Sequence, residues 1–443
     1  MSDQEMELAE DDNDSENETM EEENEDKSKP EEVYLPNKPL DEGEELICDQ
    51  SAYVMLHQAQ TGAPCLSFDV IRDSLGDNRE TYPLTAYIVA GTQASQAHVN
   101  NIIVMKLSNL HKTNKEEDDD DDDDDDDEEE LNDEVLKHPK MAGALIKHQG
   151  CVNRIRSTII NEKVIAASWS ELGRVNLWDL SQQLDAVDSD QVLSRYNKEN
   201  RANSIKPLFT FTGHQKEGFA IDWCPTTVGV LATGDCKRDI HIWKPGNGAS
   251  WQVDQRPLVG HTDSVEDLQW SPVERSVIAS CSVDKSIRIW DTRAQPSKAC
   301  MLTAENAHES DVNVISWNRN EPFIVSGGDD GFLHIWDLRR FQDKTPVATF
   351  KHHTDAVTTV EWHPTDSAVF SSGGSDNQVA LWDLSVEKDD ETNSDEIEGI
   401  PPQLLFIHQG QNNIKELHWH PQLPGVIIST AESGFNIFRT ISV

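Results

Sequence analysis

The 443-residue chain contains no cluster of lysine and arginine residues. It has 37 Lys and Arg against 82 Asp and Glu, which gives a formal net charge of -45 at pH 7. Binding of phosphate groups requires clustered positive side chains, and so does attraction to an anionic membrane surface. The composition therefore argues against direct binding of nucleic acid or membrane, and it makes basic proteins the natural partners.

Paired cysteines and long apolar runs are also missing. The 7 cysteines are scattered and no two have CxxC spacing, which predicts a reducing compartment rather than a zinc site or a disulfide framework. No stretch approaches the ~18 apolar residues of a membrane span, and residues 1–10 lack the basic and apolar regions of a secretory signal. We expect a soluble protein of the cytosol or nucleus that holds no metal and no cofactor.

Catalytic motifs are absent as well. The chain has no Gly-rich phosphate-binding loop, no HExxH string and no GxSxG string. Such strings place phosphate-binding amides, metal ligands or nucleophiles, so their absence favours a protein that is not an enzyme.

The negative charge lies mostly in three segments. Residues 1–32 carry 16 acidic residues against two lysines, residues 116–130 are acidic without interruption, and residues 387–398 carry seven acidic residues and one lysine. Such segments cannot bury enough apolar surface to offset the entropy lost on ordering, so we expect them to be disordered. Three of them in one chain favour a basic ligand over a role in solubility alone.

A repeat dominates the rest of the chain. The strings IHIWK, IRIWD, LHIWD and VALWD place Trp243, Trp290, Trp336 and Trp382 at intervals of 46 or 47 residues. A histidine precedes each of these tryptophans by 28 or 29 residues, and short apolar runs broken by turns lie between them. This pattern is typical of WD repeats, in which each unit is a four-stranded antiparallel blade.

Three consecutive units repeat one set of four residues. The sets are His261, Ser280, Asp284 and Trp290; His308, Ser326, Asp330 and Trp336; and His353, Ser372, Asp376 and Trp382. In the WD repeats that these units resemble, the histidine bonds a turn aspartate and a strand serine, and the serine contacts the tryptophan. An active site would occur once, so we interpret the sets as architecture. Lys237, Leu172 and Glu432 occupy the aspartate position in blades three, two and seven, and we expect these blades to be looser.

Residues 41–110 supply a degenerate first blade. Residues 85–92 and 101–107 read as two of its strands, and residues 65–71 as an outer strand of blade seven that closes the ring. Counting this blade, the sequence predicts an all-β fold, a seven-bladed WD-repeat β-propeller. We expect it to be a monomer.

A short amphipathic helix is expected before these strands. Its apolar positions, at the spacing i, i+3, i+4 and i+7, are Ala52, Met55, Leu56 and Ala59, and Asp49 or Ser51 would cap it. The predicted regions are then an acidic disordered tail (1–32), the helix with the ring-closing strand and blade one (33–110), an acidic disordered insertion (111–139), and blades two to seven (140–443) with an acidic loop (387–399).

From residue 34 to the C-terminus the sequence resembles the glutamate-rich WD-repeat proteins. The strings that carry the resemblance are YLPNKPLDEGEEL at 34–46, AYVMLHQAQTGAPCLSFDV at 52–70, RDSLGDNRE at 72–80 and IPPQLLFIHQG at 400–410. More widely, the chain is similar to the histone-binding WD proteins of chromatin-assembly complexes. The resemblance implies a chaperone or assembly factor for a basic protein of the large ribosomal subunit and for core histones. It also implies the nucleus and nucleolus as the main location, with the cytoplasm as a second one.

The resemblance further implies where a client would lie. In the histone binders, a client helix occupies a groove between the N-terminal helix and an acidic loop with two prolines. Carried over to this chain, the apolar lining would be Leu56, Ala59, Pro401, Pro402, Phe406 and Ile407, and the acidic groups would be Asp389, Asp390, Glu391, Asp395 and Glu396. The alternative for Phe406 and Ile407 is that they are ordinary strand core.

A second function is suggested by two short strings. WDTR at 290–293 and WDLR at 336–339 end consecutive blades and resemble the paired WDxR motif of cullin-RING ligase substrate receptors. In that hypothesis Asp291, Arg293, Asp337 and Arg339 would dock on the ligase adaptor. The two functions do not exclude each other.

Overall fold

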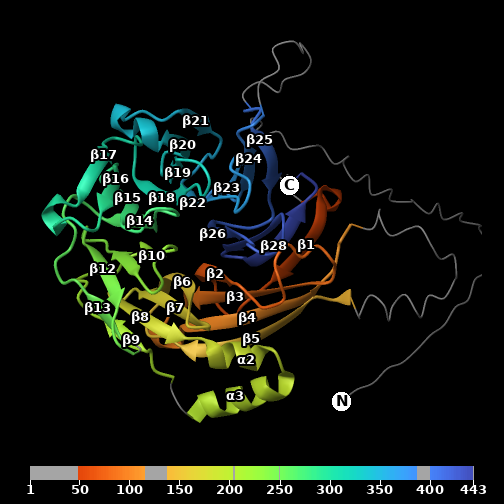
Figure 1. Cartoon of the computed structure of the whole chain (residues 1–443). Coiled ribbons are helices and arrows are strands. Elements are labelled where there is room, and N and C mark those ends of the chain that lie inside the picture. The colour runs from red at the N-terminus through yellow and green to blue at the C-terminus, as the bar shows by residue number, and fades with distance from the viewer. Residues whose placement is uncertain (1–47, 115–136, 203–204, 249, 387–399, 443) are drawn as a thin grey trace, which may run out of the picture. The chain divides into compact units, whose positions relative to one another are not determined.

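The structure is a computed structural model that describes residues 48–114, 137–202, 205–248, 250–386 and 400–442. Its strands form seven four-stranded antiparallel sheets, which confirms the seven-bladed β-propeller (Figure 1). The acidic segments 1–32, 116–130 and 387–398 lie outside the described residues, and so does the disorder predicted for them. None of the helices in the described ranges is long and apolar enough to cross a bilayer.

Blades one to six follow the chain in order, each with its innermost strand first. Blade one contains β2 (Cys65–Ile71), β3 (Leu84–Thr92), β4 (Asn101–Leu110) and β5 (Lys140–Lys147); blade two contains β6 (Val152–Ile160), β7 (Lys163–Ser170), β8 (Arg174–Asp179) and β9 (Phe209–Phe211). Blade three contains β10 (Ile221–Trp223), β11 (Leu231–Gly234), β12 (Ile240–Pro245) and β13 (Trp251–Val253); blade four contains β14 (Val265–Trp270), β15 (Val277–Ser282), β16 (Ile287–Asp291) and β17 (Cys300–Ala304). Blade five contains β18 (Val312–Trp317), β19 (Phe323–Gly328), β20 (Phe332–Asp337) and β21 (Ala348–Lys351); blade six contains β22 (Val357–Trp362), β23 (Val369–Gly374), β24 (Val379–Asp383) and β25 (Leu404–His408).

Blade seven joins the two ends of the described chain. It contains β26 (Ile414–Trp419), β27 (Val426–Ala431), β28 (Gly434–Thr440) and, outermost, β1 (Tyr53–Ala59). β1 pairs antiparallel with β28, with Leu56 opposite Phe438. An N-terminal strand therefore closes the ring as predicted, but this strand is 53–59 and not 65–71. Residues 65–71 form β2, the innermost strand of blade one.

The predicted helix over residues 52–59 is wrong. Only η1 (Gln50–Ala52) is helical, a single 3-10 turn whose predicted cap, Asp49, accepts a hydrogen bond from the N–H of Ser51 at 2.9 Å. β1 is buried on both faces, because Met55 packs between blades seven and one while Leu56 packs between blades six and seven. A strand that is apolar on both faces loses its two-residue period, so its apolar spacing resembles that of a helix.

The innermost strands of the seven blades contact one another in turn and surround a central channel (Figure 1). Polar side chains on these strands accept hydrogen bonds from the backbone of the next blade. Three of these bonds join Ser157 N to Asp69 Oδ2 (2.5 Å), Trp270 N to Asp222 Oδ2 (2.7 Å) and Trp419 N to Glu361 Oε2 (3.0 Å). An apolar cluster fills each space between blades, so the core is distributed around the ring.

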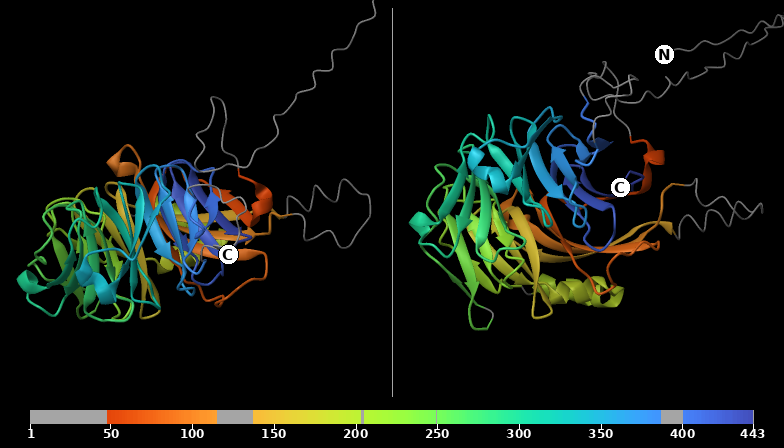
Figure 2. Two further views of the ribbon diagram at one scale, coloured as in Figure 1. Left: turned by 90° about the horizontal axis from the view of Figure 1, so that it is seen from above. Right: turned by 45° about the horizontal axis from the view of Figure 1, so that its top comes forward.

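Two helices lie between β8 and β9. α2 (Ser181–Val187) and α3 (Asp190–Ala202) pack on the outer strands of blade one (Figure 2). The hydroxyl of Tyr196 donates to the carbonyl of Leu145 on β5 at 2.7 Å, so the helices cover the edge of that blade. The remaining helical turns are η2 (Ala97–Val99), η3 (Pro296–Lys298) and η4 (Leu338–Asp343).

Candidate functional site

The three predicted sets of four residues are hydrogen-bonded as expected. In blade four, Nδ1 of His261 lies 2.9 Å from Asp284 Oδ2, and its Nε2 lies 2.7 Å from Ser280 Oγ. The indole N–H of Trp290 donates to the same serine oxygen at 2.8 Å. The sets of His308 and His353 repeat these contacts in blades five and six.

The electrostatics of the sets fit a structural role. Burial lowers the pKa of His261, so the imidazole stays neutral between a carboxylate and a hydroxyl. Although burial alone would raise it, the hydrogen bond from His261 holds the pKa of Asp284 well below its usual range. Because each polar group has its partner, these histidines hold the blades together and are not free to act on a substrate.

Blade three has a complete set, contrary to the prediction from Lys237. His214 Nδ1 lies 2.9 Å from Asp235 Oδ2, and His214 Nε2 lies 2.8 Å from Thr233 Oγ1. The indole N–H of Trp243 donates to the same threonine at 2.9 Å. Asp235 stands two residues before the expected position and reaches the histidine from there, so the expected loosening of this blade is wrong.

Blades two and seven do lack the carboxylate. In blade two, His148 Nδ1 lies 2.9 Å from the carbonyl oxygen of Gly150 in place of an aspartate. In blade seven, His408 lies 3.0 Å from the side-chain nitrogen of Asn436 and 2.7 Å from the hydroxyl of Tyr53. Tyr53 belongs to β1, so the histidine of blade seven bonds the strand that closes the ring.

A second series of tryptophans, at the ends of the innermost strands, joins neighbouring blades. The indole N–H groups of Trp223, Trp270 and Trp362 donate to the carbonyl oxygens of Arg156, Asp222 and Ser316 at 3.0, 3.1 and 3.0 Å. Each acceptor lies on the preceding blade. These tryptophans are therefore structural staples and not a ligand-binding stack.

The central channel contains a cavity of about 730 Å³ and a network of buried charges. Glu416 accepts hydrogen bonds from Arg154 Nη1 at 2.8 Å and Arg156 Nη2 at 2.6 Å. Burial opposes it, but Glu361 and Glu416 raise the pKa of His418 to about 10, and this imidazolium lies 3.0 Å from Glu361. The charges of the network are paired with one another, which makes it part of the ring's framework.

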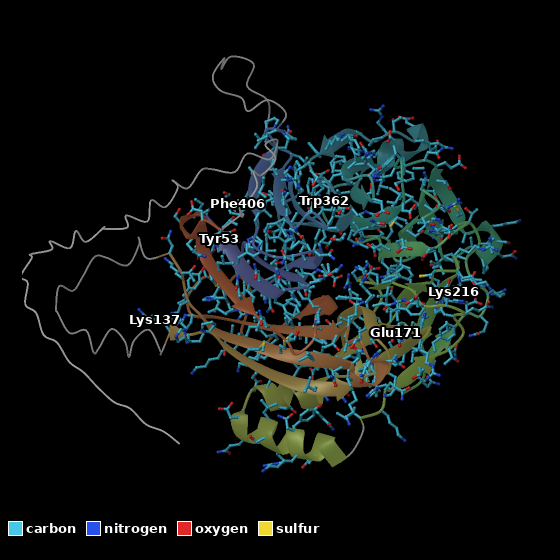
Figure 3. The ribbon with its side chains drawn as sticks, turned by 180° about the vertical axis from the view of Figure 1, so that it is seen from behind. Tyr53, Lys137, Glu171, Lys216, Trp362 and Phe406 are labelled. Carbon is cyan, nitrogen blue, oxygen red and sulfur yellow. The ribbon has the colours of Figure 1, made fainter. Side chains whose placement is uncertain are left out.

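Strands β1 and β25 meet at the outer edge of blades six and seven. Tyr53 and Phe406 contact each other edge to face, with ring centroids 5.4 Å apart (Figure 3). Along this edge a row of half-buried apolar side chains faces the outside. We call it the β1–β25 surface, and it consists of Cys48, Leu404, Leu405, Phe406 and Ile407.

The predicted groove residues are only partly brought together. Phe406 and Ile407 belong to the β1–β25 surface, although Phe406 also packs partly against the core, and Pro401 and Pro402 lie just before β25. Ala59 is half-buried at the end of β1, whereas Leu56 is only 9% exposed and packs into the core between blades six and seven. Leu56 therefore does not line an open groove. Asp389, Asp390, Glu391, Asp395 and Glu396 lie outside the described residues.

The chain enters and leaves the described part at three places around this surface. Cys48 Sγ donates to the carbonyl of Gln409, which follows β25, at 2.6 Å. Thr113, just before the second gap, donates its N–H to the carbonyl of Val54 on β1 at 3.1 Å. Before the third gap, the carbonyl of Val386 accepts from Nε2 of Gln403 at 2.8 Å. No sequence pattern indicates this convergence, because it depends on β1 pairing with the last blade.

The two WDxR strings lie on the surface of blades four and five. Arg293 donates Nη2 to Asp291 at 2.7 Å, and Arg339 donates Nη2 to Asp337 at 2.8 Å. The arginine side chains are 75% and 64% exposed, so both are accessible to a partner. The structure thus places all four predicted docking residues in equivalent positions on consecutive blades.

Comparison with known families identifies the class of protein that these features define. Residues 253–291, 299–337 and 344–383 match the family model described as "WD domain, G-beta repeat". Residues 43–111, which include β1 to β4, match a family model described as "Histone-binding protein RBBP4" or its counterpart in the CAF1 complex. The chain is a WD-repeat β-propeller whose N-terminal part is similar to that of histone-binding WD proteins.

Its relatives narrow this class to one family. The chain is 45% identical over 413 residues to "Glutamate-rich WD repeat-containing protein 1" of Dictyostelium discoideum, covering 91% of this chain and 83% of that protein. It is 42% identical over 423 residues to "Ribosome assembly protein rrb1" of Schizosaccharomyces pombe (92% and 84%), and 45% identical over 452 residues to "Protein HEAT STRESS TOLERANT DWD 1" of Arabidopsis thaliana (94% and 92%). The chain belongs to the glutamate-rich WD-repeat protein family.

Proposed function

We propose that this protein is a non-catalytic assembly factor that binds basic proteins, namely a protein of the large ribosomal subunit and core histones. The S. pombe relative is named a ribosome assembly protein, and the family model over residues 43–111 is named for histone binding. The net charge of -45 attracts partners of opposite charge and speeds their encounter. Such clients place the protein in the nucleus and nucleolus, with the cytoplasm as a second location.

The observation that carries the proposal is the position of the chain ends around the β1–β25 surface. The acidic tail 1–32 precedes Cys48, the run 116–130 follows Thr113, and the segment 387–398 follows Val386. All three residues are hydrogen-bonded to β1, to Gln409 or to the chain that leads into β25. Segments that are far apart in the sequence therefore bring most of the negative charge to one edge of the ring.

The surface combines this charge with apolar side chains. Long-range attraction raises the encounter rate, but a long residence time requires desolvated contacts. The half-buried side chains of β25 offer such contacts, and an amphipathic basic segment would lay its apolar side on them. In this proposal the basic residues of the client meet Asp389, Asp390, Glu391, Asp395 and Glu396.

Surface plasmon resonance with a purified core histone and a basic ribosomal protein tests the site. Ile407→Asp is expected to raise the dissociation rate at least tenfold, about 1.4 kcal/mol, because it places a charge on the apolar strip without entering a core cluster. Met301→Asp is the matched control, since Met301 is 59% exposed on β17, the outer strand of blade four. If both variants dissociate like the wild type, the client binds elsewhere on the ring.

A second candidate is a substrate receptor of a cullin-RING ubiquitin ligase. The paired, exposed arginines of blades four and five favour it, and the name of the A. thaliana relative contains DWD. This docking site lies on other blades than the β1–β25 surface, so one protein could use both. A binding assay of the purified ligase adaptor with the chain tests it directly.

A further inference from the structure

The edge of β25 is unusually apolar for an outermost strand. Four consecutive residues, Leu404, Leu405, Phe406 and Ile407, are large, apolar and half-buried. β21, the equivalent strand of blade five, instead buries Phe350 and exposes the residues on either side of it. Among the described strands, none pairs with the outer edge of β25. Proteins cover such edges because an exposed apolar edge strand pairs with other chains.

The described chain begins against the end of this strand. Cys48 Sγ contacts the carbonyl of Gln409, and a Cβ atom on Gly410 would lie only 2.9 Å from the same sulfur. Successive Cα atoms are about 3.8 Å apart, so the residues immediately before Cys48 must also lie close to β25.

A buried donor at the same place lacks an acceptor. Gln409 is 8% exposed, and its Nε2 has no hydrogen-bond partner among the described residues. A buried amide nitrogen without a partner is unfavourable, and most such groups in proteins are bonded. The residues upstream offer acceptors in quantity, namely their backbone carbonyls and the side chains of Asp41, Glu42, Glu44 and Glu45.

We infer that residues 40–47 lie along β25 and cover the β1–β25 surface while no client is bound. The segment supplies Leu40, Leu46 and Ile47 for the apolar strip and carboxylates or carbonyls for the orphan nitrogen of Gln409. Its eight residues can span up to about 26 Å, and the five residues of β25 span about 17 Å, so the segment is long enough. The segment then acts as a built-in competitor of the client. This last step rests on the proposed function, whereas the cover itself does not.

Hydrogen–deuterium exchange on the full chain without client tests the cover. The double variant Leu46→Asp with Ile47→Asp is expected to speed exchange of the β25 amides at least tenfold. Leu8→Asp with Met20→Asp is the matched control, because it makes the same change within the acidic tail and should leave β25 unchanged. Exchange in β16 and β17 reports that the propeller remains folded.

Gln409→Met gives an independent readout of the orphan nitrogen. If Nε2 bonds the covering segment, removing the amide speeds exchange of β25 in the wild-type background and adds little to the Leu46→Asp, Ile47→Asp variant. If β25 exchanges alike in the wild type and in both variants, the inference is overturned. Protection of β25 that increases with protein concentration would also overturn it, because a second copy of the chain would then be the cover.

Saturation with a core histone separates the inference from the proposed function. Displacement predicts faster exchange of residues 40–47 while β25 stays protected, and a severalfold faster histone association for the Leu46→Asp, Ile47→Asp variant. If histone changes neither segment, the client site proposed above is wrong. The exchange of β25 in the free variants still decides whether the cover exists.

Discussion

Replacing Glu416 with Gln is expected to destabilise the closed ring strongly. The carboxylate is only 2% exposed and accepts hydrogen bonds from Ser67 Oγ at 2.6 Å and Phe68 N at 2.8 Å. It also pairs with Arg154 at 2.8 Å and Arg156 at 2.6 Å. These partners lie on β2 and β6, so a single side chain on β26 joins blade seven to blades one and two.

The size of the effect follows from what the substitution leaves behind. Gln keeps the shape of the side chain but removes its charge, so two guanidinium groups remain in the channel without their carboxylate. Removing one partner of a buried ion pair costs about 3–5 kcal/mol. Because the arginine side chains keep 13% and 18% exposure, we expect the lower end, about 3 kcal/mol.

Urea denaturation followed by tryptophan fluorescence and by circular dichroism measures this difference. Coincident transitions show that the comparison is legitimate for a chain of this size. Asp254→Asn is the control, because Asp254 pairs with Arg256 on the surface with 43% and 74% side-chain exposure, and such pairs contribute little. A Glu416→Gln midpoint equal to that of the wild type would refute the view that this network closes the ring.

Three further predictions concern the charged segments, the exposed arginines and the buried histidines. Replacing residues 118–127 with Gly and Ser should leave the melting temperature unchanged and slow histone association at low salt; the difference should shrink as salt rises, because exposed charges are screened over ~8 Å at physiological ionic strength. A large loss of stability would show instead that the run is structural. Arg293→Ala with Arg339→Ala should keep the fold and histone binding, and if the variant also keeps the ligase adaptor, the receptor hypothesis fails. Burial lowers the pKa of His408 and of His420 to about 3, so below about pH 6.5 the unfolded chain binds protons that the folded chain does not, and stability should fall as pH decreases. Equal urea midpoints at about pH 7.5 and 5.5 would contradict this.

The fold was predictable because the repeat encodes it several times over. The tryptophan and histidine series recur in phase, and the sets of His261, His308 and His353 form with the expected partners. The prediction was wrong where one residue shifted or where burial hid the period. Asp235 replaces the expected position of Lys237 from two residues away, and β1 lost its alternation because both of its faces are covered.

The candidate site was less predictable because it depends on contacts between distant segments. Phe406 and Ile407 were identified from the strings shared with a family, and the structure places them on the β1–β25 surface. The contacts of Cys48 with Gln409 and of Thr113 with Val54 join parts of the chain that no short-range pattern connects. Only the closure of the ring by β1 brings them to one edge.

The position of Leu56 separates two views of that edge. If residues 52–59 formed a helix beside an open groove, Leu56→Asp would weaken client binding and leave the fold intact. In β1, however, Leu56 is 9% exposed and packs between blades six and seven, so an aspartate there would bury an unpaired carboxylate, which costs several kcal/mol. We therefore expect Leu56→Asp to loosen blade seven and lower the melting temperature, whereas Gln58→Asp, at an exposed position of the same strand, should change it little. A Leu56→Asp variant with the wild-type melting temperature and faster client dissociation would show that Leu56 faces the client after all.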